Sequence, residues 1–326
     1  MKKRIIGVGS PLVDILSSVT DEFLSGIEGD KGGMQMVDHD QLQELIAASG
    51  DHELAPGGSA ANTILGLLKL GFDGSFLGKI SKDERGEFFL KSFTGAGGCE
   101  SRFKYSAETP TGTCLSLVTP DAERTLRPFL GAAATLGLDE VSASDFQDHD
   151  HVHIEGYLLF NPDLALKTLK AAKEAGCTVS LDLASFEVVH ANKAVLPELL
   201  SNYVDMVFAN EEEAKAWCDS DDPLIALESL AELCGTVAVK LGAEGAWVKH
   251  GDEKVFVEAH KVNAVDTTGA GDLWASGFLY GILSGLSAEK SSQLASKVGA
   301  EVVQVMGATI PEKAWNEIYS LLTKLN

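Results

Sequence analysis

The stretch at 263–278, NAVDTTGAGDLWASGF, places two glycines and an alanine immediately before a long apolar run. The run leaves little polar face, which predicts a buried helix opened by Asp272. Glycine costs roughly 1 kcal/mol against alanine in a helix interior, so Gly269 and Gly271 are expected to serve a backbone purpose. The first N–H groups of a helix lack intrahelical acceptors, and glycines let an anion approach them closely. The stretch therefore indicates a site for a phosphoryl group.

The backbone amides of Gly269, Ala270 and Gly271 are the predicted cradle for that group. Asp272 is not expected to bind the phosphate, because like charges repel, and is better placed to take a proton from an attacking hydroxyl. The preceding residues 261–266, KVNAVD, have the pattern of a strand. The alternative interpretation is an ordinary glycine-rich turn with an acidic residue in the first helical turn.

Two other phosphate-binding motifs find little support. The only Gly-Lys pair, Gly78-Lys79, lacks the upstream glycine of a Walker A motif and is followed by Ile80, so the chain is not a P-loop enzyme. The segment GVGSPL at 7–12 has the first half of a dinucleotide fingerprint, but Leu12 stands in place of the third glycine. That second signal is weak.

The composition is that of a folded, acidic protein. The 326 residues are 45% hydrophobic and 23% charged, which is enough for a packed core and argues against disorder. A formal net charge of -22 repels nucleic acid and anionic membranes, so neither is an expected partner. A polyphosphate ligand is then expected to be held by backbone amides and a metal rather than by a basic surface.

The cysteines and the first residues indicate the cellular compartment of the protein. The 5 cysteines are widely spread and include no C-x-x-C pair, which argues against a disulfide framework or a zinc site and favours a reducing cytoplasm. The opening MKKRIIGVGSPLVD is interpreted as the first β-strand, because glycines, Pro11 and Asp14 interrupt the apolar run too early for a signal peptide. No stretch approaches the roughly 20 apolar residues needed to span a bilayer.

From residue 51 onward, short β-branched runs alternate with longer helical patterns, such as the one at 161–176 that ends in Gly176. This alternation predicts an α/β fold whose mainly parallel sheet is covered by helices on both faces. Ligands in such folds bind outside the carboxyl ends of the strands. The expected strands are SFLGKI at 75–80, HVHIEG at 151–156, CTVSLDL at 177–183, DMVFAN at 205–210 and TVAVKLG at 236–242.

Two segments, residues 15–50 and 99–128, break this rhythm. The second contains two alternating runs around Pro120-Asp121, which predicts an antiparallel hairpin. Two insertions of antiparallel character in an α/β chain suggest a small appended sheet. A mobile lid over the active site is its natural use.

The segment DTTGAGDLWASGF resembles the C-terminal signature of the PfkB, or ribokinase-like, carbohydrate kinases. PGGSAANTILGLLKLG at 56–71 resembles their N-terminal signature, and the likeness runs in order through essentially all of 1–326. Within the family the sequence is most similar to adenosine kinases, in PLVDI, PTGTC at 110–114, GAAATL at 131–136 and YVDMVFANEEEA at 203–214. The resemblance implies one ribokinase-like domain with a small β-rich lid.

The resemblance also implies a reaction. The γ-phosphoryl group of ATP would move, with magnesium, to the 5′ hydroxyl of adenosine or a related nucleoside. A free sugar such as ribose or fructose is the alternative acceptor. A sugar-binding sensor without catalysis is a more distant alternative, which the presence of Asp272 argues against. A monomer and a homodimer are both compatible with the family, whose lids pair in some members only.

Roles on the acceptor side follow from the same resemblance. Asp14, at the end of the predicted first strand, is expected to accept hydrogen bonds from vicinal sugar hydroxyls. Gly57 and Gly58 would let the backbone touch the sugar, and Asn62 offers both a donor and an acceptor. Tyr157 is available to stack on a nucleobase, although aromatic residues near strand ends also belong to cores.

Roles on the nucleotide side are implied in the same way. The family's Asn-x-x-Glu orders magnesium and phosphates through water, and its VKLGAEGA-like loop at 239–246 passes the ATP ribose and phosphates. A tight turn is the alternative for that loop. The residues that match are Asn210 and Glu213 in the first motif, with Glu213 towards magnesium, and Lys240, Gly242 and Gly245 in the second.

Asp266 and Thr268 match positions that help to hold a monovalent cation, potassium, in several members of the family.

Two residues depart from the family pattern. Ser10 lies where adenosine kinases commonly carry Asn, and Ser296 lies where ribokinases place an adenine-contacting Asn. Phe186 is a second aromatic residue available for stacking on a base.

The alternating histidines of QDHDHVHIEG, at positions 149, 151 and 153, would share one face of a strand, as metal ligands do. No fourth ligand is identifiable, and magnesium prefers oxygen. The pattern is therefore interpreted as the polar entrance of a strand.

Overall fold

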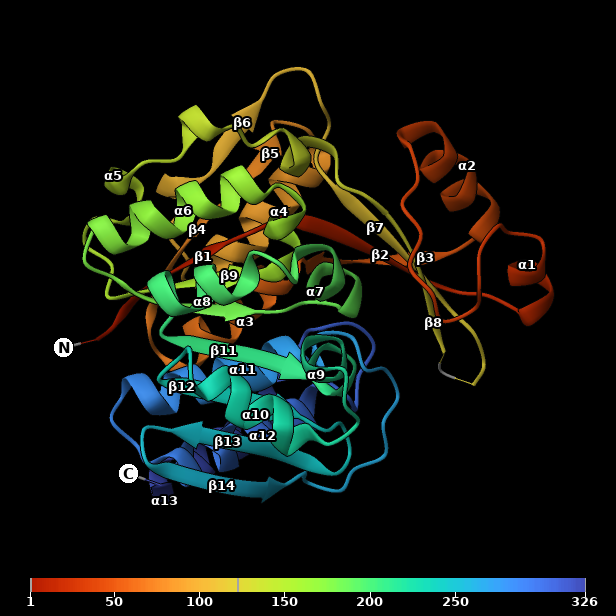
Figure 1. Cartoon of the computed structure of the whole chain (residues 1–326). Helices are drawn as coiled ribbons and strands as arrows, with labels where there is room; N and C mark the ends of the chain where they lie inside the picture. The colour runs from red at the N-terminus through yellow and green to blue at the C-terminus, as the bar shows by residue number, and fades with distance from the viewer. Residues whose placement is uncertain (1, 122, 326) are drawn as a thin grey trace.

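The central sheet of the computed structural model has eight strands (Figure 1). The structure describes residues 2–121 and 123–325. From edge to edge the order is β14-β13-β12-β11-β10-β9-β1-β4, and the strands from β4 to β12 run parallel. Their bounds are Arg4–Val8 (β1), Asp73–Leu77 (β4), His151–Glu155 (β9), Thr178–Asp182 (β10), Met206–Asn210 (β11) and Thr236–Lys240 (β12), with an antiparallel edge formed by Gly245–His250 (β13) and Glu253–Glu258 (β14).

Helices cover both faces of this sheet, which confirms the predicted α/β fold. Alternate residues of each strand point to opposite faces, and each face packs into its own apolar cluster. The first face is covered by α5 (Ala143–Phe146), α6 (Pro162–Glu174), α7 (Phe186–Asn192), α8 (Leu196–Tyr203), α9 (Glu211–Cys218) and α10 (Pro223–Ala231). The second is covered by α3 (Ser59–Leu70), α4 (Glu84–Gly95), α11 (Ala270–Leu283) and α12 (Ala288–Val302), and α13 (Glu312–Leu325) packs behind α12.

Four of the expected strands form close to their predicted bounds, as β9, β10, β11 and β12. The other, predicted at 75–80, is divided at Gly78 into β4 and β5 (Lys79–Ser81). The predicted first strand is also divided, since β1 ends at Val8 and β2 (Leu12–Ser18) begins after a turn. The two breaks lie against each other, because a Cβ on Gly78 would lie 2.7 Å from the carbonyl oxygen of Gly9.

A second sheet of four strands projects from the body, in the order β3-β2-β7-β8 (Figure 1). The predicted hairpin around Pro120-Asp121 is confirmed as the antiparallel pair β7 and β8. Two helices, α1 (Asp21–Ser25) and α2 (His39–Ser49), pack on one face of this sheet through an apolar cluster that includes Ile15, Leu42 and Leu115. Apart from β2, the strands are His52–Gly57 (β3), Thr113–Val118 (β7) and Arg124–Phe129 (β8).

The observed boundaries of this sheet differ from the predicted segments 15–50 and 99–128. Strand β3 lies outside both segments, and most of 15–50 forms helices and loops. The first part of 99–128 pairs instead with the body, where β6 (Lys104–Ser106) lies parallel to β5. The sequence therefore predicted the hairpin of β7 and β8 but not its pairing with β2 and β3.

The predicted strand at 261–266 does not form. Its residues lie in an irregular crossing between β14 and α11, and the N–H groups of Val265 and Asp266 bond to the carbonyl of Val303 rather than to a neighbouring strand. Val262 and Val265 are exposed, so the alternating pattern does not reflect a buried strand face. Strand β14 is already the edge of the sheet, and the chain leaves it here.

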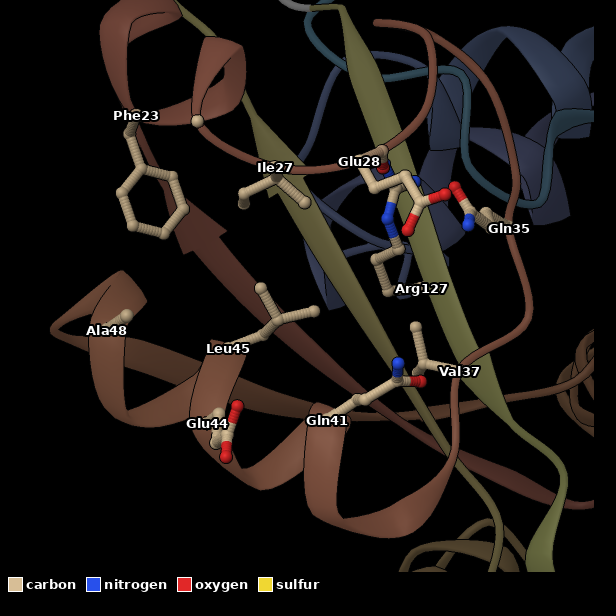
Figure 2. Close-up of a pocket in the computed structure, with 11 residues that line it drawn as sticks. Phe23, Ile27, Glu28, Gln35, Val37, Gln41, Glu44, Leu45, Ala48 and Arg127 are labelled. Carbon is tan, nitrogen blue, oxygen red and sulfur yellow. The ribbon is translucent and has the colours of Figure 1, made fainter.

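A cavity of about 500 Å³ lies on the helix-covered face of the second sheet (Figure 2). Its wall includes Phe23, Ile27 and Leu45 from the helical layer and the buried Arg127 of β8, which donates to the carbonyls of Leu126 and Glu28. None of the predicted site residues lines this cavity. It belongs to the packing between helices and sheet.

All five cysteines lie within the described residues and are free thiols. Within residues 2–121 and 123–325, no helix combines the length and the apolar character needed to cross a membrane.

Candidate active site

Asp272 lies in the first turn of α11, which begins at Ala270, two residues earlier than predicted. Two side chains of α3 hold its carboxylate: Ser59 Oγ donates to Oδ1 at 2.8 Å and Asn62 Nδ2 donates to Oδ2 at 2.9 Å. Burial raises the pKa of Asp272 to about 6, although the hydrogen bond from Asn62 opposes the shift. Such a carboxylate is ionised at neutral pH and basic enough to accept a hydroxyl proton.

The loop before Asp272 has the backbone of an anion cradle. Gly269 adopts a left-handed φ of 69°, and a Cβ on it would lie 2.6 Å from Cβ of Ala308, so the position requires glycine. The N–H of Ala270 donates to the carbonyl of Thr267 at 3.2 Å. In the part of the chain that the structure describes, the N–H groups of Gly269 and Gly271 have no protein acceptor. The loop therefore presents two free amides where three were predicted.

Lys240 supplies a positive charge beside this loop. Its Nζ donates to Oδ2 of Asp182 at 2.7 Å, and a Cβ on Gly271 would lie only 3.1 Å from the same Nζ. Burial alone would lower the pKa of Lys240, but the carboxylates of Asp182 and Glu213 raise it above its ordinary value. An ammonium ion thus stays next to the two free amides in a strongly acidic protein.

The predicted nucleotide-binding loop and the Gly-Ala-Gly loop line one cavity of about 530 Å³. Lys240, Gly242 and Gly245 lie on one side of it and Ala270 and Gly271 on another. Gly242 and Gly245 have φ values of 50° and 133°, and a Cβ on Gly245 would lie 2.1 Å from the carbonyl of Val257. The size of the cavity is typical of a small-molecule site. Sequence reasoning missed part of its wall, which includes His260, Val262 and Trp274 and also contains Ser296.

Asn210 and Glu213 do not line this cavity but form a capping box at the start of α9. The backbone N–H and Nδ2 of Asn210 donate to the two oxygens of Glu213, each at 2.8 Å. Burial, together with the nearby Asp182, raises the pKa of Glu213 to about 8. Both oxygens of Glu213 already accept a hydrogen bond from Asn210, and the expected role towards magnesium through water stays a prediction.

Asp14 lies in the middle of β2, not at the end of the first strand as predicted. It belongs to the second sheet, on the face opposite α1 and α2, where β8 also presents Arg124. Burial raises the pKa of Asp14 to about 7, and the charge of Arg124 opposes this shift. A Cβ on Gly57 would lie 2.4 Å from the Asp14 carboxyl group, so glycine is required beside it.

Gly58 and Tyr157 are the remaining residues predicted on the acceptor side. Gly58 has a left-handed φ of 100°, and a Cβ on it would lie 2.2 Å from the carbonyl oxygen of Ser10. Tyr157 is half-buried after β9, and its hydroxyl donates to the carbonyl of Ala184 at 3.4 Å. Burial raises the pKa of Tyr157, and the charges of Asp272 and Glu155 add to the shift, which places the ring within electrostatic reach of the base. Asn62 contacts Asp272 directly, a role that the sequence did not predict.

Residues 33–315, most of the chain, match the pfkB family carbohydrate kinase. The chain belongs to this family. An uncharacterized sugar kinase of Archaeoglobus fulgidus is 31% identical to it over 245 residues, which cover 75% of this chain and 96% of the relative.

Two solved structures extend the likeness to nearly the full length of this pfkB-family chain. The structure of adenosine kinase from Sinorhizobium meliloti has a TM-score of 0.89 and 33% identity, covering 98% of this chain and 99% of its own. That of a probable sugar kinase from Rhizobium etli has a TM-score of 0.88 and 31% identity, covering 100% of both chains. The chain is therefore a carbohydrate or nucleoside kinase with the ribokinase-like fold, and the relatives include both acceptor classes.

The predicted potassium residues of this pfkB-family kinase are arranged mainly for one another. Oδ1 of Asp266 accepts from N and Oγ1 of Thr268 at 2.8 and 2.6 Å, and Oδ2 accepts from the N–H of Gly307 at 2.8 Å. Arg124 of β8 also donates to Oγ1 of Thr268. A guanidinium at this oxygen does not fit a monovalent cation, so no step below involves potassium.

Sequence reasoning missed four polar residues of the candidate site: Ser59, Arg124, Glu155 and Asp182. Glu155 and Asp182 are the last residues of the parallel strands β9 and β10, both buried. Ligands of parallel sheets bind at the carboxyl ends of strands, so an acidic residue at the end of a predicted strand was an available signal. Ser59 and Arg124 become functional only through contacts made by folding.

The alternating histidines form no polar entrance. His151 and His153 are fully buried on one face of β9, and both contact Ser180 Oγ at 2.8 Å. Burial lowers the pKa of His151 to about 3 and that of His153 to about 4. Within the described residues, no group of three His, Cys, Asp or Glu is arranged to hold a metal ion. These histidines are therefore neutral core residues.

Proposed function

We propose that this kinase transfers the γ-phosphoryl group of ATP to the 5′ hydroxyl of adenosine or a closely related nucleoside. The observation that carries the proposal is Asp272, held by Ser59 and Asn62 at the start of α11, directly after two free loop amides. A base and an anion cradle then lie side by side, as transfer of a phosphoryl group to a hydroxyl requires.

Each side of the site has a distinct task in this reaction. The ionised Asp272 accepts the proton of the hydroxyl as its oxygen bonds to the γ-phosphorus and the bond to the departing ADP oxygen breaks. The amides of Gly269 and Gly271 and the ammonium of Lys240 stabilise the negative charge on the phosphoryl oxygens. Asp14 accepts hydrogen bonds from the sugar hydroxyls and so aligns the attacking group.

Magnesium is the metal that the family implies, and the described residues fit a site completed mainly by ATP itself. Oxygen ligands are suitable, yet no dedicated cluster of three carboxylates is present among residues 2–121 and 123–325. Mg²⁺ in kinase sites is commonly held by substrate phosphates and water plus one or two carboxylates. It would offset phosphate charge, with Glu213 influencing it through water.

The second sheet is proposed to act as a lid. Asp14 of β2 and Arg124 of β8 lie on the same face of this sheet, and Arg124 donates to Thr268 Oγ1, directly before the Gly-Ala-Gly loop. This contact joins the sheet to the body. Closure would exclude water from the phosphoryl group while the base is exposed to the acceptor.

The preference for a nucleoside rests on two aromatic residues and on similarity. The hydroxyl of the half-buried Tyr157 donates to the carbonyl of Ala184, and Phe186, two residues further along the chain, is 44% exposed. Either ring offers a surface on which a base can stack. The likeness to an adenosine kinase over nearly the whole chain agrees with this preference.

The test is an ADP-release screen with ATP and magnesium over adenosine, other nucleosides, ribose, fructose and sugar acids. We expect adenosine to give the highest kcat/KM. A free sugar that exceeds adenosine tenfold or more would replace the nucleoside assignment while leaving the kinase assignment intact. Binding of a sugar without any ADP release, with every acceptor, would instead favour the sensor.

A further inference from the structure

The buried carboxylate of Glu155 joins two separate segments of backbone. It lies at the end of β9, 1% exposed, and its Oε1 accepts from the N–H of Ser10 at 2.8 Å. Its Oε2 accepts from the N–H of Ala60 at 3.1 Å. A Cβ on Gly9 would lie 2.2 Å from the same carboxyl group, so the glycine leaves the room that Glu155 fills.

Those two segments are connections between the body and the second sheet. Ser10 lies between β1 of the body and β2 of the sheet, and Ala60 follows the return from β3 into α3. The connections also touch each other, because a Cβ on Gly58 would lie 2.2 Å from the carbonyl oxygen of Ser10. One side chain of the rigid parallel sheet therefore fixes the point where the chain enters and leaves the lid.

Each connection leads within a few residues to one of the two functional carboxylates. Four residues after Ser10, β2 presents Asp14. On either side of Ala60, Ser59 and Asn62 donate to Asp272. Glu155 therefore accepts one hydrogen bond from each of the backbone segments that lead to Asp14 and to the residues that hold Asp272.

The other two connections of the lid are held from elsewhere. Ahead of β7, the N–H and Oγ1 of Thr111 donate to Asp83 at 2.8 and 2.7 Å. After β8, Gly131 has a φ of 52°, and a Cβ on it would lie 2.3 Å from the carbonyl of Pro110. These contacts restrain the hairpin of β7 and β8, but they do not reach α3. Glu155 alone among these anchors links the lid to the helix that holds the base.

We propose that Glu155 is a positioning residue that clamps the hinge of the lid and sets the placement of the acceptor-binding Asp14 against the base Asp272. Only the kinetic consequence of this role rests on the proposed function. The two hydrogen bonds of the clamp do not depend on which reaction the protein catalyses.

Two variants disturb the clamp in different ways. Glu155→Gln keeps the size of the side chain but places an amide NH₂ against one of the two backbone donors, so one hydrogen bond is lost. Gly9→Ala keeps the carboxylate and displaces it. Gly95→Ala, at a position with no atom within 4 Å of the added Cβ, is the matched control.

The first measurement is hydrogen exchange of the ligand-free chain. We expect both clamp variants to exchange faster in β2, in β3 and in the first turn of α3, about tenfold, with β7 and the body strands unchanged. The control should match the native protein. Unchanged exchange in β2 and α3 would overturn the clamp, whatever the acceptor proves to be.

The second measurement is steady-state kinetics with whichever acceptor gives the highest kcat/KM for the native enzyme. Loss of alignment predicts about a tenfold fall in kcat/KM for the acceptor, while the calorimetric affinity for ATP stays within twofold. A merely structural role would weaken ATP and acceptor together, in step with a lower Tm, and would also overturn the proposal. Faster exchange with native kinetics would show a hinge that does not position the reacting groups, which contradicts it as well.

Discussion

The two sides of the active site are built on different kinds of structure. On the nucleotide side, Lys240 ends a parallel strand and the Gly-Ala-Gly loop opens α11, so the contacts belong to the packed body. On the acceptor side, Asp14 and Arg124 come from a four-stranded sheet that meets the body through a few glycine-containing connections. In the proposed mechanism, the phosphoryl group is then held by the packed body, while the acceptor is held by a separate sheet.

This difference explains which parts of the chain sequence similarity can assign to a function. A loop that binds phosphate needs glycine at set positions, because its backbone conformation leaves no room for a side chain. An acceptor pocket completed by a separate sheet changes with small shifts of that sheet, and the same signature then serves different acceptors. The resemblance to both an adenosine kinase and a probable sugar kinase fits this division.

The largest expected effect lies at the base. Asp272→Asn keeps the size of the side chain but cannot accept the hydroxyl proton, so kcat should fall on the order of 10²–10⁴-fold. Calorimetric affinities for ATP and acceptor should remain close to native. Asp163→Asn, exposed on α6, is the control. Near-native kcat in Asp272→Asn would remove the proposed mechanism.

The acceptor side should respond differently. Asp14→Asn weakens charge-assisted hydrogen bonds to the sugar, each worth roughly 1.5–3 kcal/mol, so we expect KM for the acceptor to rise about 10- to 100-fold. KM for ATP should change little, because Asp14 belongs to the lid. Steady-state kinetics in both substrates tests this, with Glu53→Gln on β3 as the control. A larger rise in KM for ATP than for the acceptor would contradict the division between the sides.

The nucleotide side is tested by Gly271→Ala. The added Cβ would lie 3.1 Å from Lys240 Nζ, so the ammonium must shift away from the loop amide. We expect KM for ATP to rise about tenfold, roughly the loss of one charge-assisted hydrogen bond, with KM for the acceptor unchanged. Gly95→Ala is the control, since its Cβ meets open space. A selective effect on the acceptor would show that Gly271 serves the other side.

The pH dependence of kcat/KM tests whether Asp272 is the base. The pKa of Asp272, about 6, predicts an acidic limb of kcat/KM near pH 6, below the limb that Asp14, with a pKa of about 7, contributes through acceptor binding. Asn62→Ala removes a hydrogen bond that favours the ionised form, so the pKa rises and the acidic limb should move up, by about one unit. Asn202→Ala, exposed on α8, should leave the limb in place. A limb that stays at pH 6 in Asn62→Ala would assign it to another group.

The smallest effect concerns stability. Burial raises the pKa of Glu213 to about 8, so the native state binds a proton that the unfolded chain releases above about pH 4.5. This group therefore makes the free energy of unfolding increase as the pH falls from 8 to 5. Glu213→Gln should flatten that dependence by on the order of 1–3 kcal/mol in urea titrations, whereas the exposed Glu212→Gln should not. A steeper dependence in Glu213→Gln would contradict the assignment.

The fold class and the nucleotide side could be predicted from the sequence because local patterns determine them. Alternating strand and helix patterns predicted the parallel sheet, and four strands form close to their expected bounds. The glycines of the Gly-Ala-Gly loop and of VKLGAEGA report a backbone conformation, which a short segment specifies by itself. Even here, the bond from Ala270 to Thr267 could not be seen in the sequence.

What the tertiary structure alone decided are the partners brought together from distant parts of the chain. Asp14 lies in β2 of the second sheet rather than at the end of the first strand, because a turn at 9–11 divides an apolar run that looks continuous in the sequence. Folding brings Asp182 into contact with Lys240, Arg124 with Thr268, and Glu155 with the backbone of two connections to the second sheet. These partners are too far apart in the sequence for a local pattern to predict the contacts. The residues at 261–266 alternate like a strand yet form none, because the sheet already ends at β14 and hydrogen-bond partners are supplied by the fold rather than by the segment. The sequence by itself determined the backbone conformation of the loop, and the packing of the second sheet on the body determined which distant side chains lie near it.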